Sequence, residues 1–511
     1  MKVRVSRGTL LKYALTYSIA LSLFYVGVRF LQSRAWFLGV FFICSAGILI
    51  YLYTFHKKVP AKYLVPGVLF LVLFQIYPSF YSGYVAFTND SNGHEISKTQ
   101  AISTIIENSK VPITNAGPVI FRAAIENSSK KLFLIFEYPK DSWWAGNSSS
   151  LEQLQVSQIV KSSDSSIEKV HGFRLLNSNE TEAVSGDLGD IQVKLKSGLV
   201  LQAQDLQTLQ VSKPSMVYFP AKDELVNVES GVRYHPNNNG QMVSQAGEAL
   251  YPGWKTTVGW RNFTSIIHNA DIRHPLLKVL AWTFLNAIIL IALSFLMGLC
   301  LALIFNSPLL YSRRIYRTIF IVPMAIPSVL SVLVWSGLFT AQTGVIDRIF
   351  HISTPWLTDS LWARIAVLIV ELWVTFPYMF LICTGAIQAI PNEIIEAAEI
   401  DGASPLKVFG LIKLPLVMRT VAPLLVASGA MALNNFGVIY LLTGGGPTFP
   451  NTNGNAGATD ILISYTYKLA FNSQEGSNYG LASALSILNF ILIGILSVYG
   501  LRRMKTMEGV N

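Results

Sequence analysis

Eight long apolar stretches dominate this sequence and exclude an ordinary soluble fold. A helix needs about 20 apolar residues to cross the hydrocarbon core of a bilayer. Of the 511 residues, 51% are hydrophobic and only 13% are charged, so much of this apolar surface must face lipid. We therefore predict an α-helical polytopic membrane protein with eight transmembrane helices. The predicted spans are 13–31, 36–53, 63–87, 277–305, 315–339, 361–387, 417–442 and 481–501.

Basic residues orient these spans. Clusters precede the first span, separate the second from the third and the fourth from the fifth, and follow the eighth. If the spans alternate, all four clusters lie on one side, which the positive-inside rule identifies as the cytoplasm. We therefore predict two cytoplasmic termini, and the net charge of +10 needs no nucleic-acid partner. The basic residues are Lys2, Arg4, Arg7, Lys12, His56, Lys57, Lys58, Lys62, Arg313, Arg314, Arg317, Arg502, Arg503 and Lys505.

The basic N-terminus and the first apolar run also resemble a signal peptide. That run is long enough to span the bilayer, however, and no A-x-A cleavage site follows it. We predict a retained first span.

The connection 88–275 falls on the opposite side and is too long for a loop. It is polar, with β-like runs at 131–138 and 191–201 and a turn signal at Asn237-Asn238-Asn239-Gly240. We predict a mostly β or mixed domain outside the membrane, inserted after the third helix. Trp143 and Trp144 could serve a partner surface, but core positions are the favoured interpretation.

No residue pattern in the chain predicts catalysis, a metal site or a disulfide. Cys44, Cys300 and Cys383 lie in separate apolar runs without C-x-x-C spacing. His94, His171 and His235 lack the spacing of metal ligands. No G-x-x-x-x-G-K-[ST] sequence occurs, so we predict that the chain neither hydrolyses ATP nor holds a cofactor.

The cytoplasmic segment 391–415 predicts two short helices joined by a tight turn. Pro391 suits the first turn of a helix, and Gly402 suits a left-handed terminator. Ser404 and Pro405 would begin the second helix, and Pro415 would mark the start of the next span. The segment is too apolar for an isolated loop, so it either packs against its own bundle or is covered by a partner. Its large apolar side chains include Ile394, Ile395, Ile400, Phe409 and Ile412.

This segment resembles the EAA loop of the permeases of ABC importers. The matching residues are Glu396-Ala397-Ala398, Gly402 and Ile412-Lys413-Leu414-Pro415. Further segments, with the eight spans and the large external domain, are similar to the larger membrane subunits of maltose-type importers. These segments are Phe376-Pro377-Tyr378-Met379, Leu433-Asn434-Asn435-Phe436, Leu441-Leu442-Thr443-Gly444-Gly445-Gly446-Pro447 and Tyr465-Thr466-Tyr467.

The resemblance implies a multi-pass inner-membrane permease that imports an oligosaccharide, driven by ATP hydrolysis on separate subunits. It divides the chain into three helices in 1–87, a periplasmic domain in 88–275, and a permease core of five helices in 276–511. The implied partners are a second permease subunit, two ATPase subunits that bind ATP and Mg, and a periplasmic solute-binding protein. The implied ATPase-docking residues are Glu396, Ala397, Ala398, Gly402, Phe409, Leu414 and Pro415.

Polar and aromatic residues within the sixth and seventh spans are candidates for substrate binding. Such groups are costly in a bilayer and fit a sugar pocket, but polar residues also join helices to one another. The candidates are Glu371, Trp373, Thr375, Tyr378, Ser428, Asn434 and Asn435. We expect Glu371 to line the translocation path. The resemblance implies sugar contacts here, although Met324, Thr375, Met431 and Ala432 depart from the family pattern, so maltose itself is not implied.

Two other classes of membrane protein fit the sequence less well. A secondary transporter would carry internal repeats with broken helices in matching positions, and no such repeat is present. A membrane sensor would need a cytoplasmic output domain, which the short segment after Arg503 does not supply. Neither class explains the segment 391–415.

Overall fold

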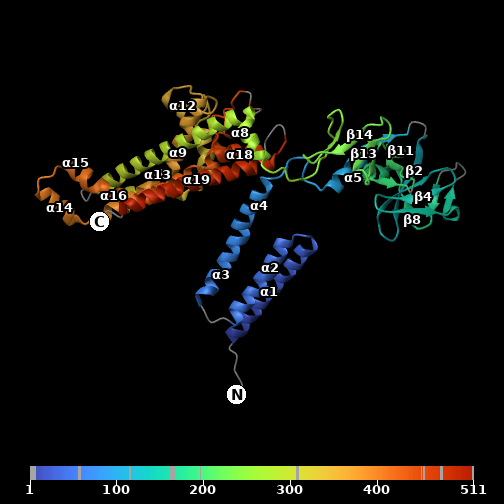
Figure 1. Cartoon of the computed structure of the whole chain (residues 1–511), viewed down its shortest axis with the longest axis horizontal. Helices are drawn as coiled ribbons and strands as arrows, with labels where there is room; N and C mark the ends of the chain where they lie inside the picture. The colour runs from blue at the N-terminus through green and yellow to red at the C-terminus, as the bar shows by residue number, and fades with distance from the viewer. Residues whose placement is uncertain are drawn as a thin grey trace, which may run out of the picture. The chain divides into compact units, whose positions relative to one another are not determined.

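The computed structural model describes residues 7–55, 59–113, 117–161, 167–195, 197–306, 310–450, 452, 455–471 and 476–508. The chain forms two compact units, one of Met1–Phe87 with Ser483–Asn511 and one of Thr88–Ala482. Each is described by itself (Figure 1). Five residues used to orient the spans lie outside the described ranges: Lys2, Arg4, His56, Lys57 and Lys58.

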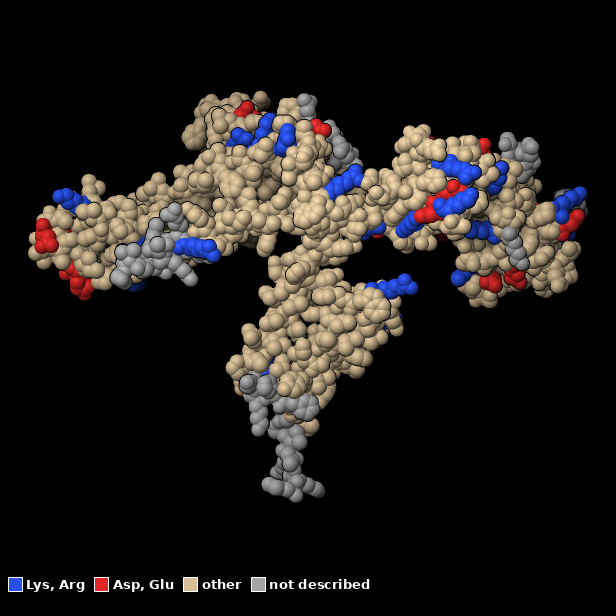
Figure 2. All heavy atoms as spheres, in the orientation of Figure 1, with Lys and Arg blue, Asp and Glu red and all other residues tan. Residues whose placement is uncertain are grey.

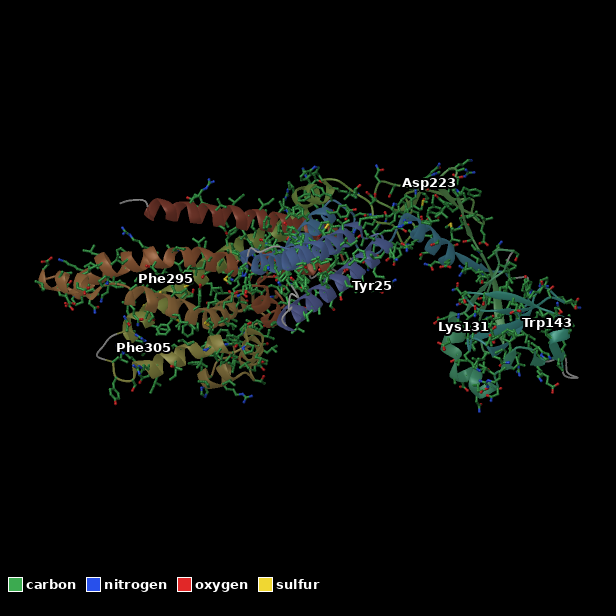
Figure 3. All side chains as sticks on the ribbon, turned by 90° about the horizontal axis from the view of Figure 1, so that it is seen from below. Tyr25, Lys131, Trp143, Asp223, Phe295 and Phe305 are labelled. Carbon is green, nitrogen blue, oxygen red and sulfur yellow. The ribbon has the colours of Figure 1, made fainter. Side chains whose placement is uncertain are left out.

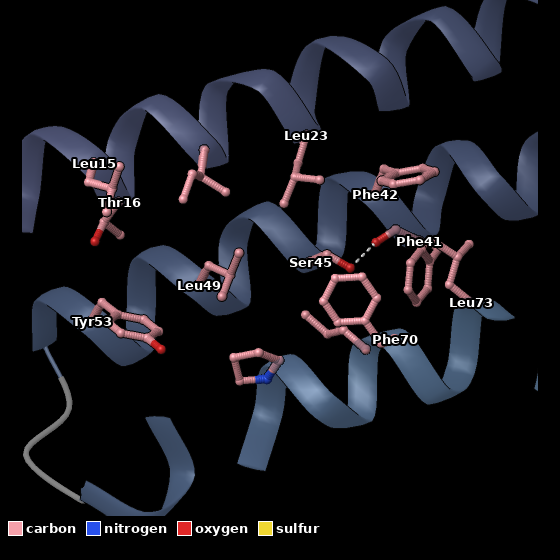
Figure 4. A pocket seen from close by; sticks show the side chains of 13 residues that line it. Leu15, Thr16, Leu23, Phe41, Phe42, Ser45, Leu49, Tyr53, Phe70 and Leu73 are labelled. Atoms are coloured by element: carbon pink, nitrogen blue, oxygen red, sulfur yellow. Dashed lines mark hydrogen bonds between the residues drawn. The ribbon is translucent and has the colours of Figure 1, made fainter. Parts of the chain in front are cut away.

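The first unit is built from apolar helices near the N-terminus. They are α1 (Arg7–Gln32), α2 (Trp36–Ile50) with the π-turn η1 (Tyr51–Phe55), α3 (Val59–Leu71), η2 (Val72–Ile76) and α4 (Tyr77–Val85). α1 and α2 form a close hairpin, because a Cβ on Gly27 would lie only 2.9 Å from the carbonyl oxygen of Gly39. A cavity of about 470 Å³ opens between α1, α2 and the α3–η2 helix (Figure 4).

Seven described helices are long and apolar enough to cross a membrane, and an eighth span results if one bent helix pair is counted. The seven spans are Leu10–Gln32, Trp36–Thr54, Val59–Val85, Ala270–Phe305, Ser360–Gln388, Pro405–Ala432 and Tyr479–Gly500. Their surfaces are largely uncharged (Figure 2). The predicted polytopic helical class is confirmed.

The fifth predicted span, 315–339, is not one straight helix. It consists of α10 (Arg313–Ala325) and α11 (Ser328–Leu338), whose axes differ by 92°. The break lies at Ile326, which has extended backbone (ψ 131°). A residue before proline is driven out of the helical region, and Pro327 follows Ile326 directly. The predicted fifth span is therefore a bent pair of helices.

Besides α10 and α11, the helices after residue 260 form the helical core of the second unit. They are α8 (Arg261–His268), α9 (Ala270–Phe305), α12 (Val345–Phe350), α13 (Ser360–Gln388), α14 (Asn392–Ile400), α15 (Pro405–Val408), η4 (Phe409–Lys413), α16 (Leu414–Ala432), α17 (Phe436–Leu442), α18 (Leu462–Phe471) and α19 (Tyr479–Glu508). Only the first residues of α19 belong to this unit. The seventh predicted span, 417–442, is interrupted: α16 ends at Ala432 and α17 begins at Phe436.

The α9–α13 contact is the tightest described helix packing of the core. A Cβ on Gly298 would lie 2.7 Å from the backbone nitrogen of Phe380. Glycine therefore lets the two backbones approach closely. Further along α9, the ring centroid of Phe305 lies 4.9 Å from that of Phe320 on α10. Figure 3 labels Phe305 and Phe295, which both belong to α9. These contacts fix the position of α13, which carries most of the candidate substrate residues.

The sheet-rich domain confirms the predicted mixed fold after the third span. Within the described ranges, β1–β11 form one sheet with a main path of β5-β4-β3-β2-β11-β10-β9, and β12–β15 form a second sheet. The helices are α5 (Lys98–Asn108), η3 (Val156–Gln158), α6 (Ser178–Ala183) and α7 (Ser185–Asp190). The strands are β1 (Lys110–Pro112), β2 (Val119–Glu126), β3 (Leu132–Glu137), β4 (Trp143–Gly146), β5 (Leu151–Leu154), β6 (Ile159–Lys161), β7 (Ile167–Val170), β8 (Phe173–Leu175), β9 (Gln192–Lys194), β10 (Val200–Ala203), β11 (Thr208–Pro214), β12 (Met216–Phe219), β13 (Glu224–Asn227), β14 (Arg233–Pro236) and β15 (Met242–Ser244).

Most of the local predictions for this domain are confirmed. The run 131–138 is β3, and the asparagine-rich turn joins β14 to β15 with Gly240 at φ 74°. The run 191–201 is instead two short strands, β9 and β10, that pair across a turn at Gly198. Trp143 is buried in the core, and the indole N–H of Trp144 donates to the carbonyl of Tyr138 (2.8 Å).

Candidate functional site

The segment 391–415 projects from the end of the helices of the core (Figure 1). α14 begins at Asn392, so Pro391 is its N-cap residue rather than part of its first turn. Gly402 has a φ of 78°, and the N–H of Ala403 donates to the carbonyl of Ala398 (2.9 Å). Glycine adopts this left-handed conformation without the steric cost that a side chain brings. The predicted turn is confirmed.

The second half of this segment differs from the prediction of a separate short helix. α15, η4 and α16 are continuous from Pro405 to Ala432. In the π-turn η4, the N–H of Leu414 donates to the carbonyl of Phe409. A proline ring normally clashes with the carbonyl four residues before it, and the wider π-turn gives Pro415 room. The second half of the segment is therefore continuous with a membrane span.

Apolar side chains of this segment divide between the bundle and solvent. Ile395 and Phe409 pack against the core cluster around Leu299 and Phe380. Four other apolar side chains stay exposed: Ile394 (44%), Ile400 (86%), Leu406 (83%) and Leu411 (76%). Glu396 and Ala397 are also exposed, and Ala398 is half-buried. Packing within the chain therefore explains only part of the apolar character of this segment.

A buried polar cluster joins three helical segments of the core. Glu371 on α13 is fully buried. Its carboxylate accepts a hydrogen bond from the amide of Asn286 on α9 (2.8 Å) and one from the amide of Asn435 at the α16–α17 break (2.7 Å). The sequence analysis missed Asn286, although an asparagine inside the fourth apolar run is the kind of signal that identified Glu371.

The other candidate substrate residues have more varied surroundings. The hydroxyl of Thr375 donates to the backbone carbonyl of Glu371 (2.7 Å), so it is used within its own helix. The ring of Trp373 meets Trp335 of α11 edge to face at 6.0 Å. Tyr378 is exposed, as is Asn434, and Ser428 is half-buried. Glu371 and Asn435 are thus brought into contact, while the roles of the others stay predictions.

Glu371 offers a test of this cluster. Replacing Glu371 with leucine leaves two buried amides without their acceptor, and we expect a loss of about 1–3 kcal/mol for each unpaired group. Glu371→Gln should cost much less, because the buried Oδ1 of Asn286 has no partner among the described residues and can accept from the new amide. Thermal unfolding in detergent measures both variants. Equal losses would contradict this account.

A second buried polar cluster holds the connection that follows α17. The carboxylate of Asp460 accepts from the ammonium of Lys468 (2.7 Å), the hydroxyl of Ser464 (2.8 Å) and the N–H of Gly457 (2.7 Å). Asp460 and Lys468 are both buried. A side chain at Gly445 would overlap the Asp460 carboxylate. This overlap explains why glycine occupies the middle of the Gly444–Gly446 turn.

Comparison with known proteins identifies the chain. A family model described as "Binding-protein-dependent transport system inner membrane component" matches residues 294–504. A second, "N-terminal of TM subunit in PBP-dependent ABC transporters", matches residues 69–149. The maltose/maltodextrin transport system permease protein MalF of Yersinia pestis is 30% identical over 477 residues, covering 89% of this chain and 87% of that protein. The chain belongs to the ABC-importer permease family.

Two further similar proteins are a second MalF and a transporter of known structure. MalF of Escherichia coli (strain K12) is 31% identical over 483 residues, covering 91% of this chain and 90% of that protein. The solved structure of a bacterial ABC transporter that imports the acidic polysaccharide alginate aligns over 48% of this chain and 84% of that chain, with a TM-score of 0.42 and 23% identity. The predicted family is confirmed. Among the described residues, no group of His, Cys, Asp and Glu is arranged to hold a metal ion.

Proposed function

We propose that this permease forms part of the translocation path of an ATP-driven oligosaccharide importer in the bacterial inner membrane. Both termini lie in the cytoplasm, and the domain 88–275 lies in the periplasm. The three N-terminal helices occupy 1–87, and the permease core occupies 276–511. The relatives are maltose and maltodextrin permeases, which supports a sugar substrate. ATP and Mg bind to partner ATPase subunits, and a second permease subunit and a periplasmic binding protein complete the importer.

The observation that carries this proposal is the exposed apolar surface on the projecting segment 391–415. Ile400 ends α14 just before the Gly402 turn, and Leu406 and Leu411 belong to the helix Pro405–Ala432. Such a surface fits a cleft on a partner, and the helical continuity carries a rigid-body change to the membrane. The proposed docking residues are Glu396, Ala397, Ala398, Gly402, Phe409, Leu414 and Pro415.

Capture of an ATPase subunit by the membrane-embedded permease tests the docking surface. We expect the wild-type chain to co-purify with a co-expressed ATPase subunit and the double variant E396K/G402V to release it. Valine is strained at the φ of Gly402, and lysine reverses an exposed charge. Gly410→Ala is the matched control, because a Cβ there meets nothing within 4 Å. Retention of the ATPase by the double variant would argue against docking at this segment.

Uptake into liposomes tests the transport reaction itself. The assembled importer should accumulate a labelled oligosaccharide only when ATP is supplied on the ATPase side. Uptake by the isolated chain without ATP would support a secondary transporter instead. ATP-dependent uptake of another solute, with no uptake of maltose or other oligosaccharides, would support an ATP-driven importer but contradict the proposed oligosaccharide substrate. The proposed substrate residues are Glu371, Trp373, Thr375, Tyr378, Ser428, Asn434 and Asn435.

A further inference from the structure

A polar cavity of about 620 Å³ lies between two connections that were predicted to share the periplasmic side. One connection contributes residues near Asn92 and Asn269, and the other contributes residues around Asn455 and Asn478. This volume falls within the range of about 300–1,000 Å³ that small-molecule sites occupy. Most of the lining side chains are polar, unlike those of the apolar cavity in the first unit.

Two polar groups lining this cavity have no hydrogen-bond partner among the described residues, and one of them is buried. The hydroxyl of Tyr465 on α18 makes no hydrogen bond to a described residue. The side-chain Oδ1 of Asn455 is buried without a donor. Nearly all buried polar groups in proteins are paired, so each exception needs an explanation. One unpaired hydroxyl and one unpaired acceptor in the same cavity fit a bound molecule that both accepts and donates hydrogen bonds.

Few titratable groups line the cavity. They are Asp271, His94 and Tyr465. Burial lowers the pKa of His94. The other polar groups are mostly side-chain amides and hydroxyls, which suit the hydroxyl groups of a sugar. A smaller cavity of about 190 Å³ shares Asp271 and Thr452 and adds the ring of Phe449.

We infer that this cavity is a carbohydrate-binding site on the periplasmic side of the permease, separate from the candidate residues of α13 and α16. The inference rests on the proposed function and deepens it, because it gives the sugar a binding site before it reaches the membrane spans. Tyr465 and Asn455 bind hydroxyl groups of one sugar unit. The adjoining smaller cavity accommodates the neighbouring unit of an oligosaccharide.

Protection of an engineered cysteine from a maleimide tests this site in the assembled importer. Ser477 lines the cavity, and Ser477→Cys is nearly isosteric. The three native cysteines, Cys44, Cys300 and Cys383, are replaced first. Maltotriose, cellotriose and raffinose serve as probes. We expect at least one of them to slow the labelling of S477C but not that of S103C, the control on the exposed face of α5.

Two variants then connect protection with the unpaired groups. Tyr465→Phe should raise the sugar concentration for half-protection about 2- to 10-fold, the effect of one hydrogen bond. Asn455→Ala should raise it similarly without lowering the unfolding temperature, because it removes an acceptor that no described residue uses. Tyr467→Phe, on the same helix but outside the cavity lining, should change nothing.

Two results would overturn the inference. If none of the three sugars slows the labelling of S477C, the cavity holds water only. If protection is the same in wild type, Tyr465→Phe and Asn455→Ala, the sugar binds elsewhere. ATP-dependent uptake in the same preparation separates these failures from failure of the proposed function. If the importer still accumulates sugar, the proposed function stands and only the cavity site is rejected.

Discussion

Gly298→Leu is expected to destabilise the permease by about 3 kcal/mol, the upper end of the usual cost of overpacking. A Cβ at this position would lie 2.7 Å from both the carbonyl carbon of Met379 and the nitrogen of Phe380. Both are backbone atoms, so no rotamer change relieves the overlap, and α9 and α13 must separate. Their separation also disturbs the hydrogen bond between Asn286 and Glu371.

Gly385→Leu is the matched control for this prediction. Gly385 lies on α13 itself, and a Cβ there meets no atom within 4 Å. Both substitutions gain the same helix propensity, so their difference isolates the packing of α9 against α13. Thermal unfolding of purified protein in detergent, followed by tryptophan fluorescence, measures both. If the two variants unfold at the same temperature, the close approach of α9 to α13 is wrong.

Lys468→Met is expected to cost about 3–5 kcal/mol, the usual effect of removing one partner of a buried ion pair. Asp460 is fully buried, and the ammonium of Lys468 is its only described cationic partner. Methionine retains most of the apolar stem but leaves the carboxylate uncompensated. The connection after α17 then loses its main polar contact. The same unfolding measurement applies, with protease sensitivity of this connection as a second reading.

The double variant D460N/K468M provides the control for the ion pair. Replacing both charges removes the unpaired carboxylate, so the double variant should be more stable than K468M alone. The Oδ1 of an asparagine can still accept from the N–H of Gly457, and its amide can donate to the hydroxyl oxygen of Ser464. Suppose instead that D460N lowers the stability of K468M by as much as it lowers that of the wild type. Asp460 and Lys468 then act independently, and the buried ion pair does not stabilise this connection.

The membrane spans could be predicted because their main determinant is local. An apolar run of sufficient length satisfies its backbone within one helix, whatever surrounds it. The break at Ile326 was also readable in principle, since Pro327 restricts the residue before it. The left-handed turn at Gly402 was predicted for the same reason, because glycine's conformational freedom is a property of the residue alone.

The pairing of polar groups could not be predicted in the same way. Asn286 and Glu371 are far apart in sequence, and only the packing of α9 on α13 brings them together. Asp460 and Lys468 are eight residues apart, and their contact depends on how the chain enters α18. Sequence patterns identified Glu371 and Asn435 as costly in a bilayer. They did not predict that the two side chains form a hydrogen bond with each other.

The helix from Pro405 to Ala432 is continuous over 28 residues. At 1.5 Å per residue its length is about 42 Å. A tilt of about 10° at the end that carries α15 therefore displaces the other end by about 7 Å, more than twice the length of a hydrogen bond. That distant end adjoins Asn435, whose amide is held by Glu371. If the segment 391–415 docks as proposed, a small rotation there would be geometrically amplified into the opening or closing of a single polar contact in the membrane.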